Sequence, residues 1–148
     1  MKKLMFAALG LMATPVMATT VELCVADHPH QITVEVADTF ESRARGLMGR
    51  DHLPEHAGMW FVYDEQRPGD AGFWMYNTYI PLDIAYLNEN MEIVSIITME
   101  PCPSIIPEQC PGYRPNVPYY GAIELNKNYF KRYGIGLGRQ FKRCDTGE

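Results

Sequence analysis

The stretch that decides the fold is residues 82–99, which read LDIAYLNENMEIVSIITM. Leu82–Asn88 and Glu92–Met99 are rich in the aliphatic, aromatic and β-branched residues that strands favour. Glu89-Asn90-Met91 between them is typical of a turn. The stretch therefore predicts a β-hairpin, and the rest of the chain adds further segments of the same kind.

Strand-like segments recur on both sides of this hairpin. Ile32, Val34 and Val36 alternate with polar residues, which is the pattern of a half-buried strand. Met59–Tyr63 is apolar throughout and is expected to be covered on both faces. Asp27–His30 is expected to turn the chain back from a first strand. Further strands are expected at Thr20–Ala26, Gly121–Asn126 and Arg139–Arg143.

One short helix is predicted before the apolar segment. Asp38 followed by Glu41 resembles a capping box, which satisfies free backbone N–H groups at a helix start. Gly46 is placed to end the helix near Arg45. Many short strands with one or two short helices indicate a mainly β domain, built as a compact β-sandwich or barrel.

Residues 1–18 have the three parts of a secretory signal peptide. Lys2 and Lys3 precede the apolar run Leu4–Met12, and Val16-Met17-Ala18 supplies the small residues that signal peptidase recognises. We expect the mature protein to begin at Thr19 and to be periplasmic or secreted. The apolar run is shorter than the ~20 residues that span a bilayer, so no membrane insertion is expected after the signal is removed.

The charge of the chain is acidic. Its 18 acidic and 13 basic residues give a net charge of −5, and loss of Lys2 and Lys3 changes it to −7. An acidic protein of this kind is a poor partner for nucleic acids and anionic lipids. Residues 19–148 suit a single domain in length. We therefore expect one β-rich domain whose partner is a small polar ligand or an envelope protein.

All four cysteines lie in the expected mature chain, and an even count in an exported protein favours two disulfides. Cys102 and Cys110 lie in a proline-rich excursion, residues 101–114. A short covalent loop there would order backbone that has no strand partner. We predict the pairs Cys102–Cys110 and Cys24–Cys144, the second of which joins the first strand to the last.

Misplaced polar residues indicate a site. Residues 73–84, FWMYNTYIPLDI, place polar side chains within an aromatic and aliphatic run. Strand alternation puts Asp83 on the face opposite Leu82 and Ile84, and Glu124 is likewise flanked by apolar residues. Unpartnered buried carboxylates are costly. We therefore predict that both converge on one pocket, whose other ligand-binding residues are Arg45, Trp74, Asn77 and Thr78.

Asp83 and Glu124 have a functional and a structural interpretation. The functional one is a carboxylate pair for acid/base chemistry, or for holding a polar ligand or a cation. In the structural one, Asp83 caps a turn and Glu124 pairs with an arginine to hold the fold together. Both interpretations stay open at the level of sequence.

Histidines and methionines offer the ligands of a copper-type site, which are His28, His30, His52, His56, Met48, Met59 and Met75. The structural alternative is that the first histidine pair flanks a turn proline and the second lies in a polar loop. Methionines in apolar runs usually fill cores. We favour the structural alternative, so neither a metal nor a cofactor is expected.

Five motifs follow one another along the chain: residues 45–50 (RGLMGR), residues 58–63 (GMWFVY), residues 73–84, residues 123–126 (IELN) and residues 134–136 (GIG). In this order they resemble the bacterial and archaeal family catalogued as domain of unknown function 192, from about Ile32 to Phe141. The resemblance implies a compact, mostly β domain of jelly-roll-like character. It implies no biochemical activity, because none is established for the family.

The chain departs from the family pattern in three places. Tyr76 stands where the family often has a basic residue, residues 126–128 replace an Asn-Ala-Gly-like turn, and residues 101–114 resemble an insertion. A family role that needs a cation beside Met75 is therefore not expected here.

The sequence favours a binding or accessory protein of the cell envelope with a polar pocket around Trp74–Asp83. The alternative is a small periplasmic hydrolase or lyase with Asp83 and Glu124 as catalytic residues, and copper-type metal binding is a lesser alternative. The sequence contains no nucleophile elbow or phosphate loop. It therefore leaves open whether the protein is an enzyme.

Overall fold

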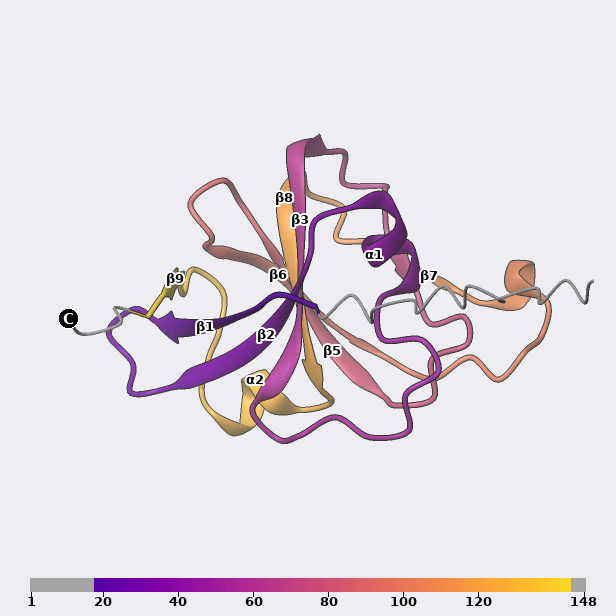
Figure 1. Cartoon of the computed structure of the whole chain (residues 1–148). Coiled ribbons are helices and arrows are strands. Elements are labelled where there is room, and N and C mark those ends of the chain that lie inside the picture. The colour runs from indigo at the N-terminus through magenta and orange to yellow at the C-terminus, as the bar shows by residue number, and fades with distance from the viewer. Residues whose placement is uncertain (1–17, 145–148) are drawn as a thin grey trace, which may run out of the picture.

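The computed structural model describes residues 18–144, which form a strongly twisted seven-stranded sheet with smaller elements on both faces (Figure 1). The strands of this sheet are β1 (Thr20–Val25), β2 (Gln31–Ala37), β3 (Ala57–Arg67), β5 (Leu82–Leu87), β6 (Ile93–Met99), β8 (Tyr119–Asn126) and β9 (Phe141–Arg143). They lie in the order β6-β5-β8-β3-β2-β1-β9. Neighbours are antiparallel except β2 and β3, which run parallel.

The remaining elements are short. A two-stranded sheet pairs β4 (Phe73–Trp74) with β7 (Gly112–Tyr113), and the helices are α1 (Phe40–Arg45), the 3₁₀ helix η1 (Pro107–Gln109) and α2 (Tyr129–Arg132). None of the helices in residues 18–144 is long and apolar enough to cross a membrane. Residues 1–17 of the expected signal peptide lie outside the described residues.

The sheet curls until its two edge strands meet at one corner. Glu92, just before β6, forms an antiparallel bridge with Gln140, just before β9. Beside this bridge, the N–H of Ile93 donates to the carbonyl of Arg139 at 2.9 Å. The N–H of Phe141 donates to the carbonyl of Met91 at 3.0 Å. The mainly β, barrel-like fold predicted from the sequence is thus confirmed, as is the hairpin of β5 and β6.

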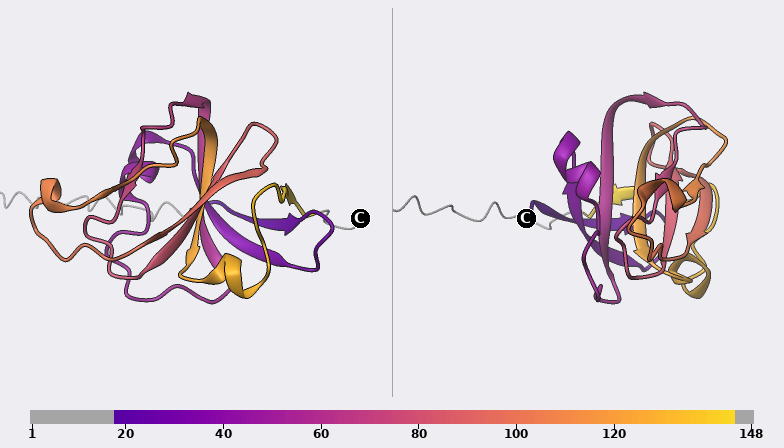
Figure 2. Two further views of the ribbon diagram at one scale, coloured as in Figure 1. Left: turned by 180° about the vertical axis from the view of Figure 1, so that it is seen from behind. Right: turned by 90° about the vertical axis from the view of Figure 1, so that its right-hand side faces the viewer.

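Both faces of the sheet are covered, so the molecule has two cores. Figure 2 shows α1 and α2 on opposite sides of the sheet. Alternate residues of β5 enter different cores: Ala85 and Leu87 belong to the core that includes α2, whereas Ile84 and Tyr86 belong to the other. Every residue of β5 is therefore buried.

The start of α1 differs from its predicted capping box. Thr39, not Asp38, is the N-cap: its side chain accepts from the N–H of Ser42, and the side chain of Ser42 accepts from the N–H of Thr39. The prediction from Asp38 and Glu41 was wrong because the extended backbone of the cap lies one residue later. The predicted end at Gly46 is confirmed, and its φ of +49° suits glycine.

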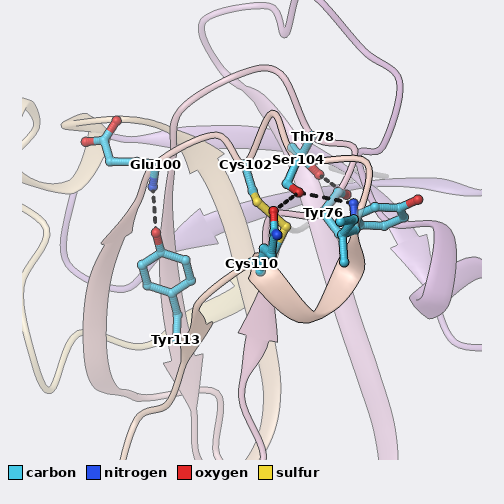
Figure 3. Close-up of a disulfide and its surroundings, with 9 residues drawn as sticks. Tyr76, Thr78, Glu100, Cys102, Ser104, Cys110 and Tyr113 are labelled. Carbon is cyan, nitrogen blue, oxygen red and sulfur yellow. Dashed lines mark hydrogen bonds between the residues drawn. A yellow bond between two sulfur atoms is a disulfide. The ribbon is translucent and has the colours of Figure 1, made fainter.

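Both predicted disulfides are present. Cys24 bonds to Cys144 and Cys102 to Cys110. The second bond closes the base of the excursion that carries η1, beside Tyr76 (Figure 3). The excursion is also attached to residues 73–76, because Tyr76 bridges Cys102 and β4 pairs with β7. Two disulfides indicate an oxidising environment.

The two disulfides are expected to differ in their contribution to stability. They span 120 and 8 residues of sequence. Loop-closure entropy then predicts that exchanging Cys24 and Cys144 for serine lowers the free energy of unfolding by about 5 kcal/mol, against about 2.5 kcal/mol for Cys102 and Cys110. Urea unfolding of the two double variants measures both values. A larger loss from the short loop would contradict the prediction.

Candidate functional site

Asp83 and Glu124 lie on opposite faces of the sheet. In the register of β5 against β8, Glu124 is directly opposite Ile84, whereas Asp83 is opposite Leu125. Residues directly opposite each other point to the same face, and neighbours along a strand point to opposite faces. The prediction that the two carboxylates converge on one pocket is therefore wrong.

Asp83 has a hydrogen-bonding partner within the sheet. Its side chain is buried, and Oδ1 accepts a hydrogen bond from the hydroxyl of Thr98 at 2.7 Å. Thr98 is the residue opposite it on β6. The expectation that Asp83 caps a turn is thus corrected: the carboxylate joins two neighbouring strands, which is a structural role.

Glu124 has no such partner. Its side chain is only 4% exposed, yet no hydrogen bond or ion pair to its carboxyl occurs among the described residues. The arginine partner expected for it is absent there, because Arg43 donates to the carbonyls of Asp38 and Val62 instead. Burial raises the pKa of Glu124 to about 8, so at pH 7 the carboxyl is mostly protonated and can donate a hydrogen bond.

The carboxyl of Glu124 faces a cavity of about 40 Å³. Three of the predicted ligand-binding residues also line it: Arg45 at the end of α1, Trp74 in β4, and Thr78. Thr78 is buried and its hydroxyl donates to the carbonyl of Tyr76 at 3.3 Å. Arg45 is exposed and, among residues 18–144, is in no ion pair. The cavity thus combines a buried carboxyl with a free guanidinium at its rim.

Asn77 supports this arrangement without lining the cavity. Its backbone has a φ of +53°, a left-handed conformation that asparagine tolerates. Its carbonyl accepts from the N–H of Gly49 at 2.9 Å, and its side chain accepts from the hydroxyl of Tyr79 at 2.8 Å. Asn77 therefore joins the residues that follow α1 to the residues that follow β4. Of the six predicted ligand-binding residues, Asn77 and Asp83 lie outside the cavity.

A larger hollow, of about 630 Å³, lies on the other side of Arg45, between α1 and β2. Of the three carboxylates that line it, Glu35 is paired with Arg50 by two hydrogen bonds of 2.6 and 2.8 Å, and Asp38 and Glu41 are exposed, so none is both buried and unpaired. Ala18 forms part of its wall, and cleavage before Thr19 would remove that residue. The Glu124 cavity is therefore the better candidate site.

Three of the four histidines gather near α2, which the sequence did not predict. The ring of His30 lies 5.8 Å from that of His28 and 5.2 Å from that of His56, and 4.0 Å from Tyr133. Burial, then the charges of His56 and His28, lowers the pKa of His30. Nevertheless, the described part of the chain holds no group of three His, Cys, Asp or Glu side chains that could bind a metal.

The copper-type ligand set does not assemble. Met59 and Met75 are buried in the core on the Glu124 face, and Met48 lines the Glu124 cavity. His30 and His56 lie beside Tyr129, which belongs to the other core, and His28 lies beside His30. These three imidazole groups and the methionine sulfurs are therefore on opposite sides of the sheet, and Met59 and Met75 fill the core as the structural alternative expected.

The curled sheet and its carboxyl-floored cavity define a small β domain with one candidate binding site. Residues 21–142 match the family DUF192, described as "Uncharacterized ACR, COG1430". The chain belongs to this family. No curated protein matches the sequence.

Two solved structures are similar over nearly their whole length. A protein of Sinorhizobium meliloti 1021, described as a candidate transcription regulator, is 26% identical with a TM-score of 0.74 and covers 88% of this chain and 98% of its own. A protein of unknown function from Novosphingobium aromaticivorans is 28% identical with a TM-score of 0.68, over 91% of this chain and 94% of its own. These neighbours support the fold and establish no activity.

The hydrogen bond to Asp83 is expected to stabilise the sheet. Thr98→Val leaves a buried carboxylate without its partner, which should cost about 1–3 kcal/mol of unfolding free energy. Thr20→Val is the control, because Thr20 is an exposed strand residue whose hydroxyl has no hydrogen bond among the described residues. Urea unfolding compares the two. Equal losses would show that Asp83 is not a structural partner of Thr98.

The raised pKa of Glu124 predicts a pH-dependent stability. Between the ordinary value of 4.5 and about 8, the folded protein holds a proton on Glu124 that the unfolded chain releases. Stability from this group is therefore fully present below 4.5 and is lost as the pH rises to about 8. Relative to wild type, the free energy of unfolding of Glu124→Gln should therefore rise by up to about 1.4 kcal/mol per pH unit between pH 4.5 and pH 8.

Urea unfolding at pH 5, 6, 7 and 8 measures this difference. Glu89→Gln, in the exposed turn between β5 and β6, is the control and should give a constant difference from wild type. A constant difference for Glu124→Gln as well would contradict the raised pKa.

Proposed function

We propose that the protein is an exported binding domain of the cell envelope that holds a polar group of its ligand against Glu124. The observation that carries this proposal is the buried carboxyl that faces a cavity without a protein partner. A buried polar group left unsatisfied costs about 1–3 kcal/mol. A ligand that supplies the missing hydrogen bond recovers this cost, so the site favours binding.

The chemistry of the cavity restricts the ligand group. At about 40 Å³, the cavity admits a substituent rather than a whole molecule, since a single water already needs ≳10–15 Å³. A protonated Glu124 donates to a carbonyl, hydroxyl or carboxylate oxygen. Arg45 adds further donors at the rim. A small oxygen-bearing group is therefore the expected occupant.

Binding is favoured over catalysis by the positions of the two carboxyls. A reaction that uses Asp83 and Glu124 together needs both in one pocket, and they lie on opposite faces of the sheet. The hydrolase or lyase alternative then rests on Glu124 alone. Its pKa of about 8 does suit proton transfer near neutral pH, so this alternative is kept as the second candidate.

Export is proposed from the signal-peptide pattern together with the two disulfides. Residues 19–148 would form one mature domain in the periplasm, where disulfides persist. A nucleic-acid role is not proposed, because the chain is acidic, with a net charge of −5.

Native mass spectrometry of protein purified from its own periplasm tests this proposal. Wild type and the Glu89→Gln control are expected to carry the same co-purified small molecule on a chain that begins at Thr19. Glu124→Gln should lose it. Equal occupancy in all three proteins would remove Glu124 from the binding site. Turnover of the identified molecule by wild type but not by Glu124→Gln would favour the enzyme instead.

A further inference from the structure

Trp74 lines two neighbouring hollows. With Phe73, it lines both the Glu124 cavity and a groove of about 320 Å³ formed with the disulfide-closed excursion. The indole is 46% exposed, although it could gain free energy by burial. Tyr76 lies beside it, with ring centroids 5.4 Å apart and a tilt of 37°. An aromatic surface of this kind, next to an unpartnered buried carboxyl, is the arrangement of a binding face.

The excursion holds Trp74 in this exposed position. On one side, Trp74 pairs with Gly112 in the small sheet of β4 and β7. On the other side, Tyr76 bridges Cys102, which is bonded to Cys110 (Figure 3). The backbone on both sides of the indole is therefore attached to the excursion, at Cys102 of the disulfide on one side and at Gly112, two residues beyond Cys110, on the other. A ring fixed in this way loses little conformational entropy when a ligand covers it.

The groove beyond Trp74 offers charged groups that are free to bind. Asp70, Glu108 and Arg114 line it, and in residues 18–144 none of them is in an ion pair. Gly72 lets the backbone of the groove approach the excursion closely, since a Cβ there would lie 2.4 Å from the carbonyl oxygen of Tyr113. The groove therefore combines these charged groups with the aromatic side chains of Phe73 and Trp74.

We propose that the ligand is a short, neutral saccharide chain that lies across Trp74, with a ring substituent in the Glu124 cavity and a neighbouring ring in the groove. This inference rests on the proposed function and names its ligand class. A pyranose ring has C–H groups on its faces, which pack on an indole. Its hydroxyls lie around the rim, where they hydrogen-bond to carboxyl and guanidinium groups.

The sizes of the two hollows agree with this assignment. The groove has about eight times the volume of the Glu124 cavity, so it has room for a larger part of the ligand than the substituent held by Glu124. Because both hollows share Trp74, a ligand that fills both must pass over the indole. Cleavage is not part of the inference, since hydrolysis of a glycosidic bond generally uses two carboxyls that flank it.

Titration of the mature protein with defined sugars tests the inference. The probes are N-acetylglucosamine, its β-linked trimer and cellotriose, followed by intrinsic fluorescence and calorimetry. At least one trimer is expected to bind saturably and at least tenfold more tightly than N-acetylglucosamine. Trp74→Ala should weaken that binding at least tenfold. Phe40→Ala, an exposed aromatic residue of α1 outside both hollows, is the control and should bind as wild type does.

Four outcomes overturn the inference. No saturable binding of either trimer, or binding of a tripeptide library in their place, excludes the saccharide class. Unchanged trimer affinity in Trp74→Ala excludes the path over the indole. If a small ligand still depends on Glu124 but not on Trp74, the proposed function stands and this inference falls. If Glu124→Gln leaves trimer binding unchanged, the cavity is not the site and both fall. Thermal unfolding of each variant confirms that it is folded.

Discussion

The antiparallel register of β5 against β8 sets the direction of the polar side chains at the centre of the sheet. Pairing Ile84 with Glu124 sends that carboxyl to the face covered by α1 and residues 73–78. The same register sends Asp83 to the other face, where Thr98 is its hydrogen-bonding partner. A shift of one residue between the two strands would put both carboxyls on the same face. The cavity and the structural hydrogen bond therefore follow from one constraint.

The register between β5 and β8 has a large energetic effect because both faces of the sheet are covered. In a sheet with one solvated face, one of the two carboxyls would point to water at little cost. Here both are buried, so each needs a partner. Asp83 finds it within the protein, and the carboxyl of Glu124 faces a cavity instead. Asp83 and Glu124 are almost equally buried. The presence or absence of a hydrogen-bonding partner therefore distinguishes the structural carboxyl from the candidate functional one, and burial does not.

The excursion at residues 101–114 extends the structure beside Trp74. It pairs with the backbone at Phe73, Trp74 and Tyr76, and its disulfide closes residues 102–110 between these pairing positions. The Glu124 cavity and the groove thereby share Trp74. The ring of Tyr76 lies against that of Trp74, with centroids 5.4 Å apart.

The sequence by itself determined the mainly β class, the hairpins, the end of α1 at Gly46 and both disulfide pairs. These depend on local patterns, such as the alternation of Ile32, Val34 and Val36, or on the number and positions of the cysteines. Arg45, Trp74, Thr78 and Glu124, which were predicted to surround one pocket, line the same cavity, and their role in binding stays a prediction. Only the tertiary structure decided that Asp83 does not join them. Alternation assigns faces within one strand, but the register between β5 and β8 depends on packing that no local pattern contains.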